Sequence, residues 1–221
     1  EAEHLTIAGR DRLQKIISKY MLIPIDKILH DLREIKSPDE IRLIRRAGNI
    51  THRAFVMMRR VIRAGQNEKE IAWQLEKIMR ETGADGLAFP SIVAIGSHSA
   101  IPHHTPTTRK LPRGGFVLLD FGCTVAGYHS DMTRMIFLSP PRDKMKEIFQ
   151  IVQSAQHAAL KTVRANIPAY AIDKTARDMI ARAGYGDQFT NGCGHGVGLE
   201  IHELPWINKR NTTRLNPNMV V

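Results

Sequence analysis

Long apolar runs and cysteines are both scarce in this sequence. Its apolar runs are short, as at Phe116 to Leu119, so neither a membrane-spanning helix nor a signal-peptide core is predicted, and no membrane partner is expected. Cys123 and Cys193 are the only two cysteines, too few for a disulfide framework. These two shortages predict a soluble protein of a reducing compartment, most simply the cytoplasm.

Acidic residues are outnumbered, because 22 aspartates and glutamates face 32 lysines and arginines, a formal net charge of +10. An excess of this sign is typical of proteins that bind polyanions or anionic membranes. Here the basic residues are spread along the chain without an aromatic-interleaved basic patch, so no nucleic-acid partner is predicted. Hydrophobic residues at 43% and charged residues at 24% are ordinary for a globular protein of one sizeable or two small domains.

Local patterns predict a protein of the α+β class. Apolar residues at helical spacing in the leading segment, such as Leu13 and Ile16, predict an amphipathic helix over about residues 10–22, and its apolar stripe must pack on another part of the protein. Ser37 with Glu40, and Asn67 three residues before Glu70, each mark the start of a helix. The predicted helices span about 37–64, 67–83, 142–164 and 170–183, and the predicted strands span 92–95, 116–120 and 132–138.

This helix-helix-strand pattern occurs twice, at a nearly constant offset. The offsets are 164 − 63 = 101 for the ends of the long helices, 184 − 83 = 101 for the glycines that stop the second helices, and 202 − 103 = 99 for the histidines that follow. Such an offset indicates an internal duplication, although α+β chains also alternate this way by chance. A duplication would place two halves about a pseudo-twofold axis, with a site between them.

Two aspartates are candidates for metal ligands. Asp120 ends an apolar run, and Asp131 follows 131 − 120 = 11 residues later. A carboxylate at the end of a buried strand needs a partner, because an isolated buried charge is costly. That partner is either a cation such as Arg134 or a divalent metal. Two aspartates about one hairpin apart, with a histidine nearby, favour Mn, Co, Zn or Fe over a closed structural zinc site.

Histidines supply the remaining candidates. His195 lies among glycines that alternate from Gly192 to Gly198, which predicts an extended strand with its glycine face against something close. His202 follows seven residues later, so both imidazoles reach one site only if the chain turns between them. His103 and His104 are further candidates, and His98 and His129 stay undecided. His202-Glu203 begins a zincin motif, but Trp206 stands where the second histidine is required.

Four segments together carry a resemblance to a known family. They are Ile-Pro-His-His-Thr (101–105), Leu-Leu-Asp-Phe-Gly (118–122), Gly-Tyr-His-Ser-Asp-Met-Thr-Arg (127–134) and Gly-His-Gly-Val-Gly-Leu-Glu-Ile-His-Glu (194–203). In order and spacing they resemble the Xaa-Pro aminopeptidase and prolidase group of pita-bread metallopeptidases, whose relatives include methionine aminopeptidase and creatinase. The resemblance implies the pita-bread fold, a pseudo-twofold helix-helix-strand repeat around a curved antiparallel sheet.

The resemblance also implies roles for particular residues. Asp120, Asp131 and His195 would be metal ligands of a centre with two divalent ions, usually manganese, cobalt or zinc. His103 and His202 would be catalytic and substrate-binding, donating hydrogen bonds to the peptide and the developing oxyanion. The metal pair would activate a hydroxide that releases the N-terminal residue from a peptide with proline at the second position. Cys123 and Cys193 lie near proposed ligands, which fits either redox sensitivity or, more simply, packing of small side chains in the site wall.

The chain departs from the family pattern at both ends. Members of the group supply two further glutamate ligands, and the resemblance places both after Val221. Residues 1–36 match a remnant of an N-terminal domain and its linker, and residues 37–221 match a pita-bread metallopeptidase domain lacking its C-terminal part. We therefore expect a truncated chain with little peptidase activity alone, and a homo-oligomer for the full-length protein. A prolidase (Xaa-Pro dipeptidase) and a non-catalytic pita-bread peptide-binding module are the alternatives; the retained Asp/Asp/His set weighs against the module.

Overall fold

A computed structural model describes residues 5–18, 22 and 26–221 of the chain. Its helices are α1 (Ile7–Ile16), α2 (Asp26–Glu34), α3 (Pro38–Val61), α4 (Glu68–Glu81), α5 (Asp143–Thr162) and α6 (Ala169–Arg182), with 3-10 turns η1 (Gly96–Ala100) and η2 (Gly186–Gln188). Its strands are β1 (Gly86–Leu87), β2 (Ile92–Ile95), β3 (Phe116–Phe121), β4 (Cys123–Val125), β5 (Tyr128–His129), β6 (Met132–Phe137), β7 (Gly194–Gly196) and β8 (Glu203–Ile207). Helices and strands are thus mixed, as predicted.

Both predicted capping boxes are present. The Ser37 hydroxyl accepts a hydrogen bond from the Glu40 amide at 3.3 Å, and the Glu40 carboxylate accepts one from the Ser37 amide at 2.7 Å. Asn67 and Glu70 make the same reciprocal pair at 3.0 and 2.8 Å. Each box satisfies amide donors that the first turn of a helix leaves unpaired, so α3 and α4 begin where the sequence places them.

All strand pairs among the described residues are antiparallel, and they form three small sheets. The sheets have the orders β1-β4-β5, β2-β3-β6 and β7-β8. Gly122 lies between β3 and β4. The position requires glycine, because a Cβ there would lie 1.8 Å from the Ser130 carbonyl oxygen. The chain leaves one sheet for another at this close crossing, so the hydrogen-bonded ladder is divided where one curved sheet was predicted.

The internal duplication is visible in the backbone. Helices α4 and α6 start at residues 68 and 169, and end at 81 and 182, so both offsets are 101. Gly65 and Asn166, which precede these helices, both have positive φ, at 93° and 67°. Their amides donate to the carbonyl oxygens of Leu111 at 2.8 Å and Leu215 at 2.7 Å. The same turn chemistry at the same offset supports the predicted pseudo-twofold repeat.

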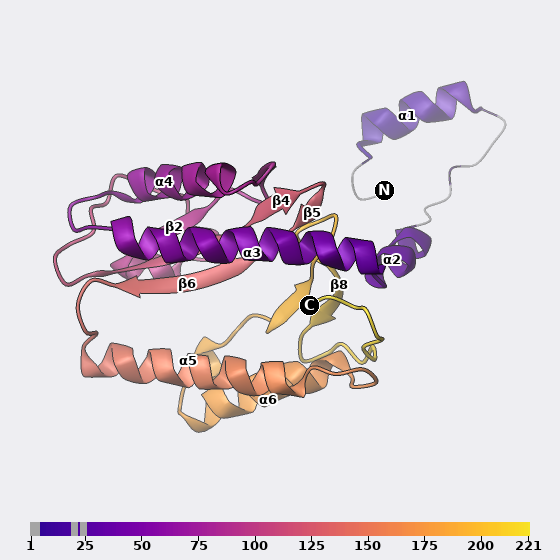
Figure 1. The fold of residues 1–221 in the computed structure, drawn as a ribbon. Coiled ribbons are helices and arrows are strands. Elements are labelled where there is room, and N and C mark those ends of the chain that lie inside the picture. The colour runs from indigo at the N-terminus through magenta and orange to yellow at the C-terminus, as the bar shows by residue number, and fades with distance from the viewer. Residues whose placement is uncertain (1–4, 19–21, 23–25) are drawn as a thin grey trace.

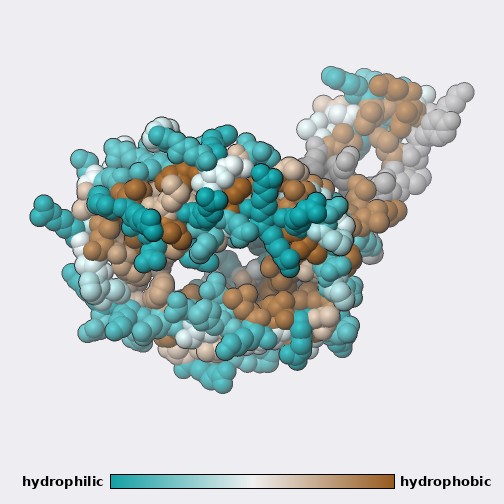
Figure 2. Space-filling view, in the orientation of Figure 1, coloured by the Kyte–Doolittle hydropathy of each residue, from teal (hydrophilic) through white to brown (hydrophobic). Residues whose placement is uncertain are grey.

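Each half of the repeat has its own hydrophobic core. The first core lies between α3, α4 and the strands of the first half, and includes Met58, Leu75, Leu119 and Phe121. The second lies between α5, α6 and β8, and includes Ile172 and Ile207. Figure 1 shows α3 and α4 on one side of the molecule and α5 and α6 on the other, with β8 between them. In the space-filling view of Figure 2 the surface is open between these two helical layers.

The leading segment differs from its prediction. Helix α1 begins after a Thr6 cap and ends at Ile16, earlier than the predicted residue 22, and residues 19–21 of the predicted helix lie outside the described part. No residue of α1 is buried, and the side chain of Ile16 is 73% exposed. Figure 1 shows α1 standing away from the other helices. Its apolar stripe therefore has no packing partner among the described residues.

None of the described helices is long and apolar enough to cross a membrane.

Candidate metal and peptide site

The two candidate aspartates lie at the same end of a hairpin. Residue Phe121 of β3 pairs with Met132 of β6, so Asp120 lies one residue before this pair and Asp131 one residue on its other side. Asp120 accepts a hydrogen bond from the Thr133 hydroxyl at 2.9 Å. The antiparallel register explains the 11-residue spacing, since the short strands β4 and β5 occupy the intervening segment.

The two histidines of the second half meet through a turn. The rings of His195, on β7, and His202, immediately before β8, have centroids 4.4 Å apart. The glycines of this segment allow the approach, because a Cβ at Gly196 would lie 2.2 Å from the Leu204 carbonyl oxygen and one at Gly198 would lie 2.5 Å from a Glu203 carboxylate oxygen. The regular strand is shorter than predicted, covering only 194–196, with a register shift. The predicted turn and close packing of glycines are both present.

The site joins the two halves of the molecule. The His195 Nε2 atom lies 3.4 Å from the Asp131 carboxylate. His103, between η1 and β3, lies near enough to Asp120 and His202 to influence both of their pKa values. All five predicted site residues thus lie in one region: three from the first half, and His195 and His202 from the second.

The pKa shifts of Asp120, His195 and His202 indicate that this region would accommodate a positive charge. Burial raises the pKa of Asp120, and the neighbouring Asp131 carboxylate raises it further. The hydrogen bond to Asp131 raises the pKa of His195, whereas burial and the nearby His195 lower the pKa of His202. Two facing carboxylates with no lysine or arginine ion pair among the described residues favour a bound cation.

The donor chemistry fits a divalent metal. Arg134, the alternative partner for Asp120, donates instead to the Thr133 carbonyl oxygen at 2.8 Å. Two carboxylates and an imidazole suit Mn, Co or Zn. Metal–ligand bonds of about 2.0–2.2 Å place neighbouring ligand atoms roughly 2.8–3.6 Å apart, from octahedral to tetrahedral angles. The Asp131–His195 separation of 3.4 Å is within this range.

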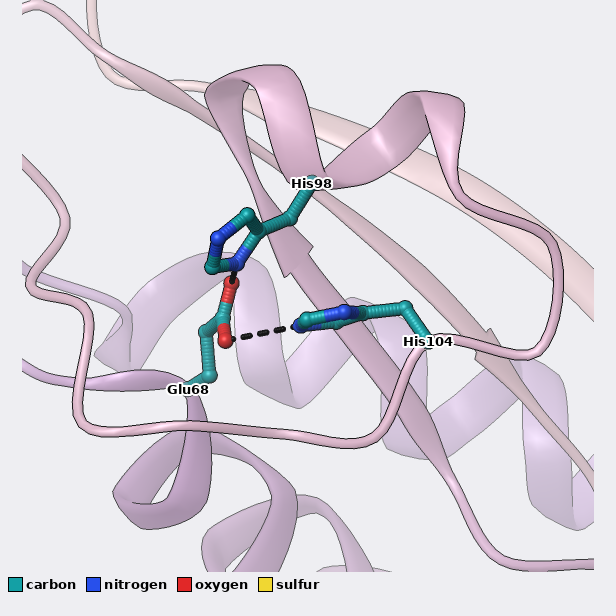
Figure 3. A group of neighbouring side chains, drawn as sticks. All are labelled: Glu68, His98 and His104. Carbon is teal, nitrogen blue, oxygen red and sulfur yellow. Dashed lines mark hydrogen bonds and ion pairs between the residues drawn. The ribbon is translucent and has the colours of Figure 1, made fainter.

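A second cluster of possible metal ligands lies around Glu68 (Figure 3). Glu68, at the start of α4, has its carboxylate 2.7 Å from His98 Nδ1 and 2.9 Å from His104 Nε2. Both separations are ordinary lengths for hydrogen bonds to a carboxylate. The same carboxylate, whose residue is 0% exposed, also accepts hydrogen bonds from the Ile95 amide and from the amide and hydroxyl of Thr107. Five donors saturate two carboxylate oxygens, so the cluster is a hydrogen-bonded support.

This support holds the segment that carries His103. Although burial alone would raise it, hydrogen bonds from Thr107, His104 and the Ile95 amide lower the pKa of Glu68 to about 2. The bonds fix the segment on both sides of His103, whose φ of 53° is unusual for a residue with a side chain. His104, and also His98, whose role the sequence left undecided, are therefore hydrogen-bond partners of Glu68. The sequence did not single out Glu68, because an acidic residue in the first turn of a helix is ordinary.

The two cysteines are free and placed differently. Cys123 is 0% exposed, and its thiol lies 3.3 Å from the Ala47 carbonyl oxygen. Burial raises the pKa of the Cys193 thiol, and its backbone amide donates to Asp173 at 3.1 Å. The complete burial of Cys123 and the raised pKa of Cys193 oppose reaction as thiolates, which supports packing as the role of both side chains.

Trp206 is a site neighbour that the zincin motif marked only as a missing histidine. Its ring centroid lies 6.0 Å from that of His195 and 6.0 Å from that of His202. Trp206 is 44% exposed at the rim of the site. An amphipathic ring in this place can contact an apolar part of a ligand while remaining partly in water.

The two-halved fold places carboxylates and imidazoles together where its halves meet, an arrangement that suits a metallopeptidase. Residues 42–221 match the model of metallopeptidase family M24, and the chain belongs to this family. The chain is 39% identical to the X-Pro aminopeptidase of Thermotoga maritima, with a TM-score of 0.92 over 99% of this chain and 62% of that one. It is 38% identical to a Xaa-Pro dipeptidase structure from Bacillus anthracis, with a TM-score of 0.95 over 99% of this chain and 61% of that one.

A curated relative gives the same picture. The Xaa-Pro dipeptidase of Pyrococcus horikoshii is 39% identical over 197 residues, which cover 89% of this chain and 56% of that protein. The predicted pita-bread fold and family are confirmed by these likenesses. The chain spans less than two thirds of the length of these relatives.

Proposed function

We propose that the chain is the part of a metal-dependent peptidase that binds the metals and the peptide, acting on peptides with proline at the second position. The observation that supports this most strongly is the meeting of Asp120 and Asp131 with His195 and His202 across two separate cores. Asp120, Asp131 and His195 would hold two divalent ions, manganese by preference. Bound there, the ions would supply an activated water near neutral pH.

The protein's own residues then orient the peptide and handle protons. Since the pKa of His202 is lowered, its imidazole is neutral at pH 7 and presents one N–H donor to a peptide carbonyl. His103 would donate from the opposite half. Two such donors, fixed before the substrate arrives, stabilise the negative charge that develops on the carbonyl oxygen. Trp206 offers a flat surface beside His202 on which a proline ring can pack.

Release of one N-terminal residue from longer peptides and cleavage of Xaa-Pro dipeptides are both compatible with this site. X-Pro aminopeptidase and Xaa-Pro dipeptidase are both names of relatives at similar identity. A dipeptidase needs a positive group to bind the product carboxylate. Assays with an Xaa-Pro dipeptide and an Xaa-Pro-Xaa tripeptide therefore separate the two specificities.

The activity test compares the chain with a longer chimera and with a variant of that chimera. The 221-residue chain is assayed alone with MnCl₂, and a chimera adds the C-terminal remainder of the Thermotoga maritima relative. We expect little turnover by the chain, which would bind metal through only part of a ligand set, and clear turnover by the chimera. The D131N chimera is the control and should be inactive. Full activity of that control, or a folded chimera without any turnover, contradicts the proposal.

A further inference from the structure

Among the residues that the structure describes, no shared hydrophobic core sets the relative position of the two halves. The buried apolar residues form two clusters, one within the first half and one within the second. Asp120 and Asp131 lie on or beside strands that pack in the first cluster, whereas His195 and His202 lie on or beside the strand pair that packs in the second. Polar contacts between the halves must therefore contribute to the distance between the carboxylates and the imidazoles.

One carboxylate directly beside His202 collects polar contacts from the segment that leads into the first half. Glu203, the first residue of β8, is 6% exposed. Its carboxylate accepts a hydrogen bond from Lys36 Nζ at 2.9 Å, and Arg33 contributes its Nε at 3.2 Å and also its Nη2. Lys36 itself is only 2% exposed, so its ammonium group is withdrawn from water together with this partner. Both cations lie in the segment that leads into α3, more than 160 residues away in sequence.

The Glu203 side chain is also enclosed by the turn that brings the histidines together. The Glu200 amide donates to it at 3.0 Å, and the carboxylate lies against Gly198, where a Cβ would be 2.5 Å from Oε2. The Gly198 carbonyl oxygen accepts a hydrogen bond from the His129 amide at 2.8 Å. The turn is thus bonded to the first half at His129 and, through Glu203, to the segment before α3.

Charge supports the same arrangement. Burial alone would raise the pKa of Glu203, but the hydrogen bonds from Arg33 and Lys36 lower it. The carboxylate is therefore ionised at neutral pH between two cations. Loss of Glu203 leaves the buried Lys36 without its carboxylate, and loss of Lys36 leaves Glu203 with Arg33 alone, so either change weakens the group.

We propose that Arg33, Lys36 and Glu203 form a positioning unit that sets the His195 and His202 side of the site against Asp120 and Asp131. The unit does not touch the substrate, and its importance for catalysis rests on the function proposed above. Replacement of outer partners of metal-binding side chains typically weakens metal affinity about 10–100-fold. We expect an effect of this size from E203Q and K36M.

The test uses the metal-free chain as well as added metal. All variants carry W73F, which leaves Trp206 beside the site as the single tryptophan; Trp73 is 66% exposed and away from both cores. The first readout is hydrogen exchange of the His129 amide, whose acceptor is in the other half. The second is quenching of Trp206 fluorescence by MnCl₂. R33Q, which changes a side chain that is 26% exposed, serves if K36M does not fold.

I172A is the matched control, because Ile172 is buried in the second core and contributes no charge. E203Q and K36M should accelerate His129 exchange at least tenfold relative to amides of the β3–β6 ladder, and weaken Mn²⁺ binding about 10–100-fold. I172A should destabilise the chain without either effect. Exchange and Mn²⁺ affinity that change no more in E203Q than in I172A would overturn the proposal.

D131N separates this proposal from the proposed function. If the W73F chain binds no Mn²⁺, or if D131N in that chain binds it equally well, the proposed assignment of the metal ligands is wrong. The His129 exchange measurement then still decides whether the positioning unit holds the halves together.

Discussion

Glu68 gives the sharpest prediction of stability, through the substitution E68Q. Its carboxylate has an ordinary pKa of 4.5 that is lowered to about 2 in the folded chain, a difference of roughly 2.5 pH units. At about 1.4 kcal/mol per unit, the ionised form contributes on the order of 3 kcal/mol to folding. Glutamine keeps the shape but replaces one acceptor oxygen by a donor, so at least two of the five donors around it lose their partner.

The energies of the lost hydrogen bonds lead to the same magnitude. Leaving a buried donor unpaired costs about 1–3 kcal/mol, so two such donors again amount to roughly 3 kcal/mol. We expect E68Q to lower the free energy of unfolding by about this amount at pH 7. The control is E76Q on the same helix, where the exposed ion pair with Arg80 should change stability by less than about 1 kcal/mol.

The pH dependence tests the cause. A lowered pKa in the folded state means that the stabilisation is complete above about pH 4.5 and is lost as the pH falls towards about 2. Protonated Glu68 resembles glutamine, so the difference between wild type and E68Q should narrow over this interval. Urea unfolding at a series of pH values measures it. A difference below about 1 kcal/mol at pH 7, or one that stays constant down to about pH 2, would refute the reasoning.

Two further predictions concern the backbone. G196A should destabilise the chain by more than about 2 kcal/mol, because its Cβ would meet the Leu204 carbonyl oxygen at 2.2 Å, whereas G48A in α3 has open space and should be neutral or stabilising by up to about 1 kcal/mol in urea unfolding. Equal effects of the two would show that β8 moves aside. S37A should cost about 1 kcal/mol by removing the cap of α3, measured by thermal unfolding, and an unchanged midpoint would show that the cap is dispensable.

Much of this fold follows from local sequence signals. The capping boxes at Ser37 and Asn67 and the stop glycines Gly83 and Gly184 act within one helical turn, so their effect is predictable without knowledge of tertiary structure. The clustering of the candidate site residues also follows from spacing. An 11-residue interval with a glycine break brings Asp120 and Asp131 to one end of a hairpin.

Long-range polar contacts escaped prediction because no periodic pattern marks them. Glu68 and Lys36 belong to residue types that are usually exposed, and only the fold shows that each is enclosed by partners distant in sequence. Helix α1 was predicted too far along the chain, because apolar spacing continues past Ile16 without a strong stop signal. Periodicity indicates a helix, but its end depends on competing local bonds.

The central claim is that Asp120, Asp131 and His195 bind divalent metal. The most direct measurement is a MnCl₂ titration of the W73F chain followed by Trp206 fluorescence, compared with D131N and with H98Q, which alters only the Glu68 cluster. We expect saturable quenching that D131N weakens more than about tenfold and H98Q leaves unchanged. Quenching that survives D131N but is lost in H98Q would move the metal to Glu68 and contradict the claim.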